Sequence, residues 1–258
     1  MADFLKIKKL WPDAEIIPAS DLILEIRSLK EEEEILLIKK AVKITEKALK
    51  EVLPLIKIGI SENDIGAEIT YRQKKMGAES DSFPLQILAG SHSALPHGRA
   101  SKKIIKNGDL LQFDIGCVYE GYHCDISRIA VVGAQPTDEQ KKIHQIVLDI
   151  QEQMIASVEA GVKLEELFFR HCDLLESAGY KAQHGLGHGV GLEIHEWPNI
   201  GMGIERKFKA APNQIFTIEP GIYIPGWGGV RIEDMVLVTE NGHEVLTKFP
   251  KDLLILDP

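Results

Sequence analysis

The stretch GDLLQFDIGCVYEGYHCDISRIAVVG, residues 108–133, determines how the rest of the sequence is interpreted. Apolar residues alternate with other residues on both sides of a turn near Tyr119 to Gly121, which predicts a β-hairpin. Each arm contains one aspartate, Asp114 or Asp125, and the midpoint of the pair falls inside the turn. In a regular hairpin these two side chains would therefore face each other directly.

Two carboxylates in this position repel each other, so one must take up a proton or a cation must lie between them. Their apolar neighbours Phe113 and Ile126 place the pair near the core, where an uncompensated charge is costly. A second predicted hairpin, residues 214–239, repeats the pattern with Glu219 and Glu233 around the turn PGWGG. Acids on one hairpin are commonly solvated, but two pairs at equivalent places favour a metal site.

The sequence also predicts four amphipathic helices, because apolar residues recur at three- and four-residue steps. Capping boxes mark two of the helix starts. The predicted ranges are 31–53, 62–76, 138–159 and 164–178. The order helix, helix, hairpin thus occurs twice, which suggests two similar halves that build one sheet covered by helices. Residues 16–26 are predicted to be a short extended piece and a turn.

Composition narrows the class of protein. The 258 residues include 30 Lys and Arg against 39 Asp and Glu, a formal net charge of −9. This balance gives no global reason to bind nucleic acid or an anionic membrane. Three scattered cysteines form no disulfide framework, which favours a reduced, cytoplasmic protein. The N-terminus lacks the pattern of a signal peptide, and no apolar run reaches the ~20 residues of a membrane helix.

The glycine-rich loop HGLGHGVG, residues 184–191, adds imidazoles to the predicted acids. Glycines around His188 let the backbone approach a bound metal ion closely. Four carboxylates and one imidazole have a charge of −4, which suits two divalent ions. Such a mixed oxygen and nitrogen set fits Mn²⁺, Co²⁺, Fe²⁺ or Zn²⁺, and the sequence does not choose among them.

Successive motifs of the chain resemble those of the metallopeptidase family with the pita-bread fold, which includes methionine aminopeptidase, aminopeptidase P and prolidase. The motifs are FDIG, YHCDISR, HGLGHGVGLEIHEWP, TIEPGIY and GGVRIEDM. EPGIY, GVRIED and SALPHG look closer to the proline-specific branch, prolidase and aminopeptidase P. The resemblance implies an α+β fold: a curved, mostly antiparallel sheet with helices on its outer face and two pseudo-symmetric halves.

The resemblance also implies a set of site residues. The family's five metal ligands fall on Asp114, Asp125, His188, Glu219 and Glu233. They would hold two divalent ions, with Mn²⁺ or Co²⁺ expected in preference to Zn²⁺ or Fe²⁺. Substrate-binding or proton-shuttling histidines fall on His97 and His195, and Glu219 is the best candidate for a proton shuttle. Three further matches, to residues that touch the substrate or support the ligands, are His184, Tyr223 and Arg231.

The implied activity is a metal-dependent exopeptidase like Xaa-Pro dipeptidase or aminopeptidase P, in which a hydroxide bridging two metals attacks the peptide bond of a short peptide. Methionine aminopeptidase, a metal-free peptide-binding relative and a creatinase-like hydrolase stay open as alternatives. Residues 1–24 are expected to be a linker or the remnant of an N-terminal domain, and residues 25–258 the catalytic domain. A homodimer is the expected assembly.

Overall fold

The structure is a computed structural model of the chain, and it describes residues 2–17, 19–201 and 208–256. Its helices are α1 (Ala2–Leu10), α2 (Ser20–Ser28), α3 (Glu32–Val52), α4 (Glu62–Lys75), α5 (Asp138–Ala156) and α6 (Leu164–Ser177), with short 3₁₀ helices η1 (Leu53–Leu55) and η2 (Gly90–Ala94). Its strands are β1 (Ser80–Asp81), β2 (Gln86–Ala89), β3 (Leu110–Ile115), β4 (Cys117–Tyr119), β5 (Tyr122–His123), β6 (Ile126–Val132), β7 (Gly187–Gly189), β8 (Glu196–Ile200), β9 (Ile215–Ile218), β10 (Gly221–Ile224), β11 (Gly228–Arg231), β12 (Asp234–Thr239), β13 (Gly242–Val245) and β14 (Leu254–Leu256).

The four predicted amphipathic helices are confirmed as α3 to α6. Two of them start as predicted: the side chain of Ser61 accepts from the backbone of Asp64, and that of Thr137 accepts from the backbone of Gln140. These capping boxes satisfy backbone N–H groups that the first turn of a helix leaves unpaired.

Two larger sheets repeat one arrangement, as the predicted duplication requires. In the first, β2, β3 and β6 are neighbours and antiparallel, and β14 adds a parallel edge. In the second, β7, β9 and β12 are neighbours and antiparallel, with β8 and β13 outside them. An isolated antiparallel bridge between Ser127 and Glu233 joins the two sheets. The predicted α+β fold with a mostly antiparallel sheet is confirmed.

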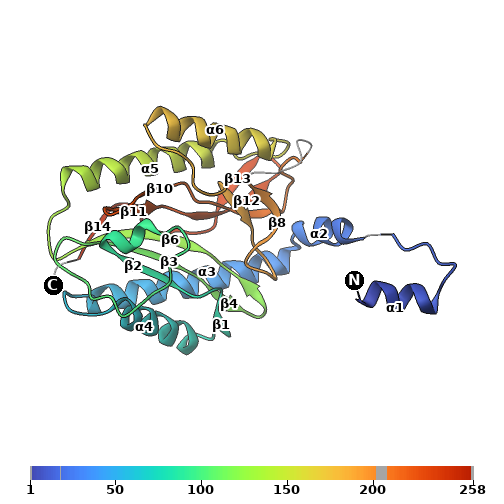
Figure 1. Cartoon of the computed structure of the whole chain (residues 1–258), viewed down its shortest axis with the longest axis horizontal. Helices are drawn as coiled ribbons and strands as arrows, with labels where there is room; N and C mark the ends of the chain where they lie inside the picture. The colour runs from blue at the N-terminus through green and yellow to red at the C-terminus, as the bar shows by residue number, and fades with distance from the viewer. Residues whose placement is uncertain (1, 18, 202–207, 257–258) are drawn as a thin grey trace.

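Helices cover the sheets from opposite sides. Figure 1 shows α5 and α6 above the strands and α3 and α4 below them. Along β3 the side chains alternate, since Leu111, Phe113 and Ile115 pack in one apolar cluster with residues of α3 and α4. Asp114, between two of these core residues, must therefore point to the opposite face of the sheet. The alternation thus turns a carboxylate toward the inside of the fold.

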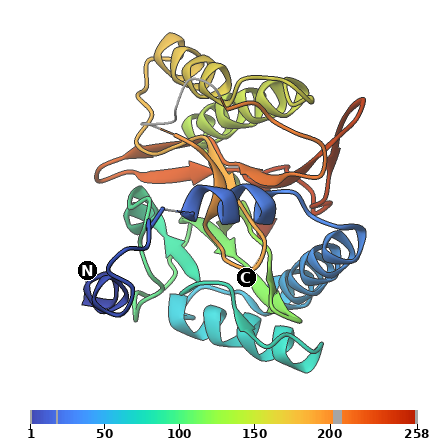
Figure 2. The same cartoon turned by 90° about the vertical axis from the view of Figure 1, so that its right-hand side faces the viewer.

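One prediction for the N-terminal part was wrong. Residues 16–26 were expected to be extended with a turn, but Ser20 to Ser28 form the helix α2. The segment from Ser20 onward contains no proline, so nothing prevents the backbone from forming i to i−4 hydrogen bonds. Figures 1 and 2 both place α2 beside β8. Among the described residues, no helix is long and apolar enough to cross a membrane.

Candidate active site

The five predicted ligands come from both halves of the fold and lie at the ends or in the middle of strands. Asp114 is in β3, and Asp125 immediately precedes β6. His188 is the central residue of β7. Glu219 directly follows β9, and Glu233 directly precedes β12. All five side chains line one cavity of about 810 Å³.

The two hairpins place their acids differently. In the first, Asp114 pairs with Ser127, so the predicted direct opposition of Asp114 and Asp125 was wrong. The reason is the turn, because Glu120 and Gly121 both have positive φ, 47° and 81°, as in a two-residue type I′ turn. That turn shifts the register, so that Asp114 and Asp125 become diagonal neighbours across the hairpin.

In the second hairpin the predicted opposition agrees with the structure. On one side Gly221 pairs with Arg231, and on the other Ile218 pairs with Asp234. The same register runs through both ladders, and it sets Glu219 opposite Glu233.

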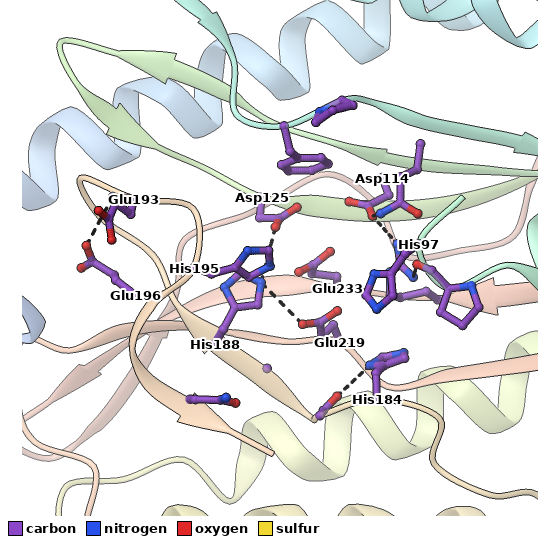
Figure 3. A pocket seen from close by; sticks show the side chains of 18 of the residues that line it. His97, Asp114, Asp125, His184, His188, Glu193, His195, Glu196, Glu219 and Glu233 are labelled. Atoms are coloured by element: carbon purple, nitrogen blue, oxygen red, sulfur yellow. Dashed lines mark hydrogen bonds and ion pairs between the residues drawn. The ribbon is translucent and has the colours of Figure 1, made fainter. Parts of the chain in front are cut away.

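Three of the predicted ligands converge closely. One potential ligand atom from each of Asp125, His188 and Glu233 lies within 4.8 Å of the other two. His188 Nε2 is 3.7 Å from Asp125 Oδ2 and 3.6 Å from Glu219 Oε1. Figure 3 shows Asp125, His188, Glu219 and Glu233 directed toward a common centre. The two hairpins and the glycine-rich loop thus deliver their side chains to one place.

The ring of His188 is oriented for metal binding. Its Nδ1 lies 3.1 Å from the carbonyl oxygen of Gly189. A carbonyl only accepts, so this contact places the proton of a neutral imidazole on Nδ1. Burial, together with the neighbouring His195, lowers the pKa of His188 to about 3. The neutral ring therefore presents the lone pair of Nε2 to the acids.

Other groups of the protein do not fully balance the charge and the hydrogen-bonding capacity of the buried carboxylates. Two of their oxygens, Asp125 Oδ1 and Glu233 Oε1, are buried without a hydrogen-bond partner among the described residues. Burial and neighbouring carboxylates raise the pKa values of Asp125 and Glu233 well above their usual range. Burial raises the pKa of Glu219 to about 8. Divalent cations would compensate these acids and pair the orphaned oxygens, so this set of donors fits a metal centre.

Arg231 supports the carboxylates of both halves. Its Nη2 donates to Asp114 Oδ2, and its Nε donates to Ser127 Oγ at 3.0 Å. Ser127 Oγ in turn donates to Glu233 Oε2 at 2.7 Å. Burial opposes ionisation of Arg231, but Tyr223 and Asp114 outweigh it and raise the pKa of the guanidinium well above its usual range. One cation thus orients two of the acids.

A chain of hydrogen bonds continues from Arg231 to His184. Arg231 Nη1 donates to the hydroxyl of Tyr223 at 2.7 Å, and that hydroxyl lies 2.8 Å from His184 Nε2. Because His184 Nδ1 lies 2.8 Å from the carbonyl of Gly185, the proton of the neutral ring is on Nδ1 and Tyr223 donates to Nε2. Burial lowers the pKa of His184 to about 4. The structure thus places all three predicted supporting residues beside the ligand group.

The two remaining predicted histidines also line the cavity. The ring of His195 meets that of His188 edge-on, with 4.2 Å between centroids. His97 belongs to the loop after η2, and Figure 3 shows it on the side of Asp114 and Glu219. Phe83 and Trp197 add apolar surface to the wall of the cavity.

Two contributors escaped the sequence analysis. Gln86 Nε2 donates to Asp114 Oδ2 at 2.5 Å, and Ser127 bridges Arg231 and Glu233. A glutamine inside the apolar run PLQILAG was the available signal for Gln86. Nothing in the sequence distinguished Ser127 from an ordinary strand serine, because its role depends on contact with the other half.

A family model for metallopeptidase family M24 matches residues 37–240. The chain belongs to this family. Xaa-Pro dipeptidase of Pyrococcus horikoshii is 41% identical over 251 residues, covering 96% of this chain and 71% of that protein. Xaa-Pro dipeptidase of Pyrococcus furiosus is 44% identical over 236 residues, 91% of this chain and 67% of that protein. The fold matches X-Pro aminopeptidase of Thermotoga maritima with a TM-score of 0.93, at 38% identity over 99% of this chain and 71% of that structure.

Membership in family M24 confirms the predicted pita-bread metallopeptidase. The prolidase of Pyrococcus horikoshii matches with a TM-score of 0.92, at 40% identity over 98% of this chain and 73% of that structure. The M24 chain is thus an enzyme of the peptidase class.

Proposed function

We propose that this M24 metallopeptidase is an exopeptidase that releases the N-terminal residue from short Xaa-Pro peptides. The observation on which the proposal depends is the convergence of Asp125, His188 and Glu233, with Asp114 and Glu219 beside them, in one cavity. The names of the similar proteins, Xaa-Pro dipeptidase and X-Pro aminopeptidase, support the substrate class.

Two divalent ions would be held by the five ligands, Asp114, Asp125, His188, Glu219 and Glu233. When bound, such a pair supplies a water of lowered pKa and polarises the scissile carbonyl. Mn²⁺ and Co²⁺ are the ions proposed first, from the resemblance to the family, and the donor set of carboxylates and one imidazole suits Zn²⁺ and Fe²⁺ as well. The unpaired oxygens of Asp125 and Glu233 support this assignment.

Glu219 is the proposed proton shuttle. Its carboxylate lies next to His188 in the cavity, 3.6 Å from His188 Nε2. With metal bound this carboxylate would be ionised, so it could accept a proton from the attacking water and later give it to the leaving amine. Thr217 Oγ1, 3.3 Å from Glu219 Oε1, orients this group.

His97 and His195 are proposed to bind the scissile carbonyl oxygen, where negative charge develops in the transition state. Both line the cavity, and His195 is held against the ring of His188. His184, Tyr223 and Arg231 form a connected row of hydrogen bonds beside the ligands. Their proposed part is to hold Asp114 and to shape the wall that the substrate contacts.

The test is a panel of peptides with the Mn²⁺- or Co²⁺-loaded protein and identification of products by mass. The proposal expects hydrolysis of Ala-Pro or Ala-Pro-Ala and a loss of at least about 100-fold in Glu219→Gln. Preferential release of Met from Met-Ala-Ser would replace the Xaa-Pro assignment with methionine aminopeptidase. Binding of peptides without cleavage of any would favour a non-catalytic relative.

The oligomeric state, the cellular compartment and the domain boundary are part of the proposal. A homodimer is proposed, and light scattering of the purified protein measures it directly. The cytoplasmic compartment and the division at residues 24 and 25 are proposed from the sequence. Limited proteolysis tests the division, since a boundary there predicts cleavage ahead of Glu25 and a stable fragment that begins near it.

A further inference from the structure

Two cationic side chains, Arg27 in the last turn of α2 and Lys30 in the connection to α3, meet one buried acid. Lys30 Nζ donates to Glu196 Oε1 at 2.6 Å, and Arg27 Nη2 donates to Glu196 Oε2 at 2.8 Å. The side chains of Lys30 and Glu196 are only 1% and 2% exposed. Because this group is buried, its geometry is fixed by the fold, unlike that of a surface ion pair.

Glu196 belongs to the loop that presents His195. It directly follows His195 and begins β8, and its Oε2 also accepts from the backbone N–H of Glu193 at 3.4 Å. The loop backbone packs directly on the carboxylate, since a Cβ added at Gly191 would lie 2.3 Å from Glu196 Oε1. The carboxylate of Glu196 therefore packs against the backbone of the loop from Gly191 to His195 and supports it.

The cationic segment is itself tied to the sheet. The backbone N–H of Lys30 donates to the carbonyl of Asn213 at 2.9 Å, and Gln214 Nε2 donates to Ser28 Oγ at 3.2 Å. Residues 213 and 214 directly precede β9, the strand that leads to Glu219. The two cations are thus held in a fixed relation to the catalytic strands.

Glu196 is not available as a metal ligand, although it lines the same cavity. Both of its oxygens already accept from cations. Figure 3 shows Glu193 and Glu196 to one side of the group that Asp125, His188 and Glu219 form. Its contribution is therefore to the position of the loop.

We propose that Arg27 and Lys30 are positioning residues that fix Glu196 and thereby hold His195 against His188. This inference rests on the proposed role of His195 in peptide hydrolysis. A displacement of about 1 Å at a group that binds the transition state can cost about 100-fold in rate, so the anchor made by Arg27, Lys30 and Glu196 controls turnover. It makes residues before α3 part of the active-site machinery.

The test measures kcat, KM and metal content for Lys30→Met, alone and in the His195→Ala background. The expected result is a loss of about 10- to 100-fold in kcat for Lys30→Met, with unchanged metal content. In the His195→Ala background the same substitution should cause no further loss, because Lys30 acts through His195. Arg27→Gln should show the same dependence on His195, and Arg27→Lys should keep most of the activity. If Lys30→Met does not fold, Arg27→Gln decides the comparison alone.

The matched control is Lys39→Met, which breaks a lysine–glutamate pair of 2.8 Å with Glu244 outside the cavity and should leave kcat unchanged. An equal fold loss in the presence and absence of the His195 side chain would overturn the inference, as would an unchanged kcat in folded Lys30→Met and Arg27→Gln. A wild-type protein that cleaves no Xaa-Pro peptide would instead overturn the proposed function.

Discussion

Ser127 and Glu233 join the two halves of this molecule: they form an isolated antiparallel bridge, and Ser127 Oγ donates to Glu233 Oε2 at 2.7 Å. The backbone N–H of Glu233 also donates to the carbonyl of Ser127 at 3.3 Å. This contact places a carboxylate of the second half beside the acids of the first. The proposed metal centre therefore depends on this contact between the two halves of the fold.

Ser127→Ala should weaken metal binding by about 10-fold or more, because Glu233 and Arg231 each lose a hydrogen-bond partner. Titration with Mn²⁺ followed by calorimetry measures the change. Ser157→Ala is the control, since Ser157 Oγ donates to a backbone carbonyl on the exposed side of α5. Equal affinities in wild type and Ser127→Ala would show that the bridge does not orient Glu233.

Metal binding should release protons near pH 7. In the absence of metal, burial and neighbouring charges raise the pKa values of Asp125 and Glu233, and burial raises that of Glu219 to about 8. These carboxyls hold protons that a cation must displace, so metal affinity should rise with pH. Calorimetry in two buffers of different ionisation enthalpy counts the protons. Identical heats in both buffers would contradict this account, and Glu219→Gln should release fewer protons than wild type.

His171 should make stability depend on pH. Both ring nitrogens are buried without a partner among the described residues, and burial lowers the pKa to about 4 from an ordinary 6.5. The folded state thus keeps the ring neutral while the unfolded state takes up a proton. The free energy of unfolding that depends on the neutral ring is therefore fully present above pH 6.5, and it is lost as the pH falls toward 4.

The comparison that isolates this effect is wild type against His171→Leu. The difference between their free energies of unfolding in urea should change by about 3 kcal/mol between pH 7 and pH 4, at about 1.4 kcal/mol per pKa unit. The leucine variant should lose less stability in acid. Parallel pH profiles for the two proteins would mean that His171 is not held neutral.

Arg128→Met should destabilise the fold by about 3–5 kcal/mol, since it leaves Asp234 buried next to fewer partners. Arg128 Nη2 donates to Asp234 Oδ1 at 2.7 Å, and the two side chains are 1% and 0% exposed. Burial alone would raise the pKa of Asp234, but Arg128 and Lys251 outweigh it and lower the pKa. Chemical denaturation measures the loss. Arg170→Met, on the exposed side of α6, is the control and should lie within about 0.5 kcal/mol of wild type.

The sequence was sufficient for features that depend on local periodicity. The amphipathic helices, the capping boxes at Ser61 and Thr137 and the opposition of Glu219 and Glu233 all follow from spacing along the chain. The opposition of Asp114 and Asp125 failed because the turn is centred one residue later than expected, which moves the partner of Asp114 by two residues, to Ser127.

Features that depend on contacts between distant segments could not be predicted from the sequence. Ser127 meets Glu233 across 106 positions, and Lys30 meets Glu196 across 166. Neither residue type is unusual in its own neighbourhood, so no local pattern marks it. The helix α2 was missed for a related reason: its position beside β8 is a tertiary contact, which propensity does not encode.

The central claim is that Asp114, Asp125, His188, Glu219 and Glu233 together hold two divalent ions, and metal content after loading with Mn²⁺ or Co²⁺ and removal of excess tests it most directly. The account predicts two ions per chain for the wild type and fewer than one for the double variant Asp125→Asn, Glu233→Gln. A wild-type protein that retains no divalent ion, or a double variant that retains both, would contradict it.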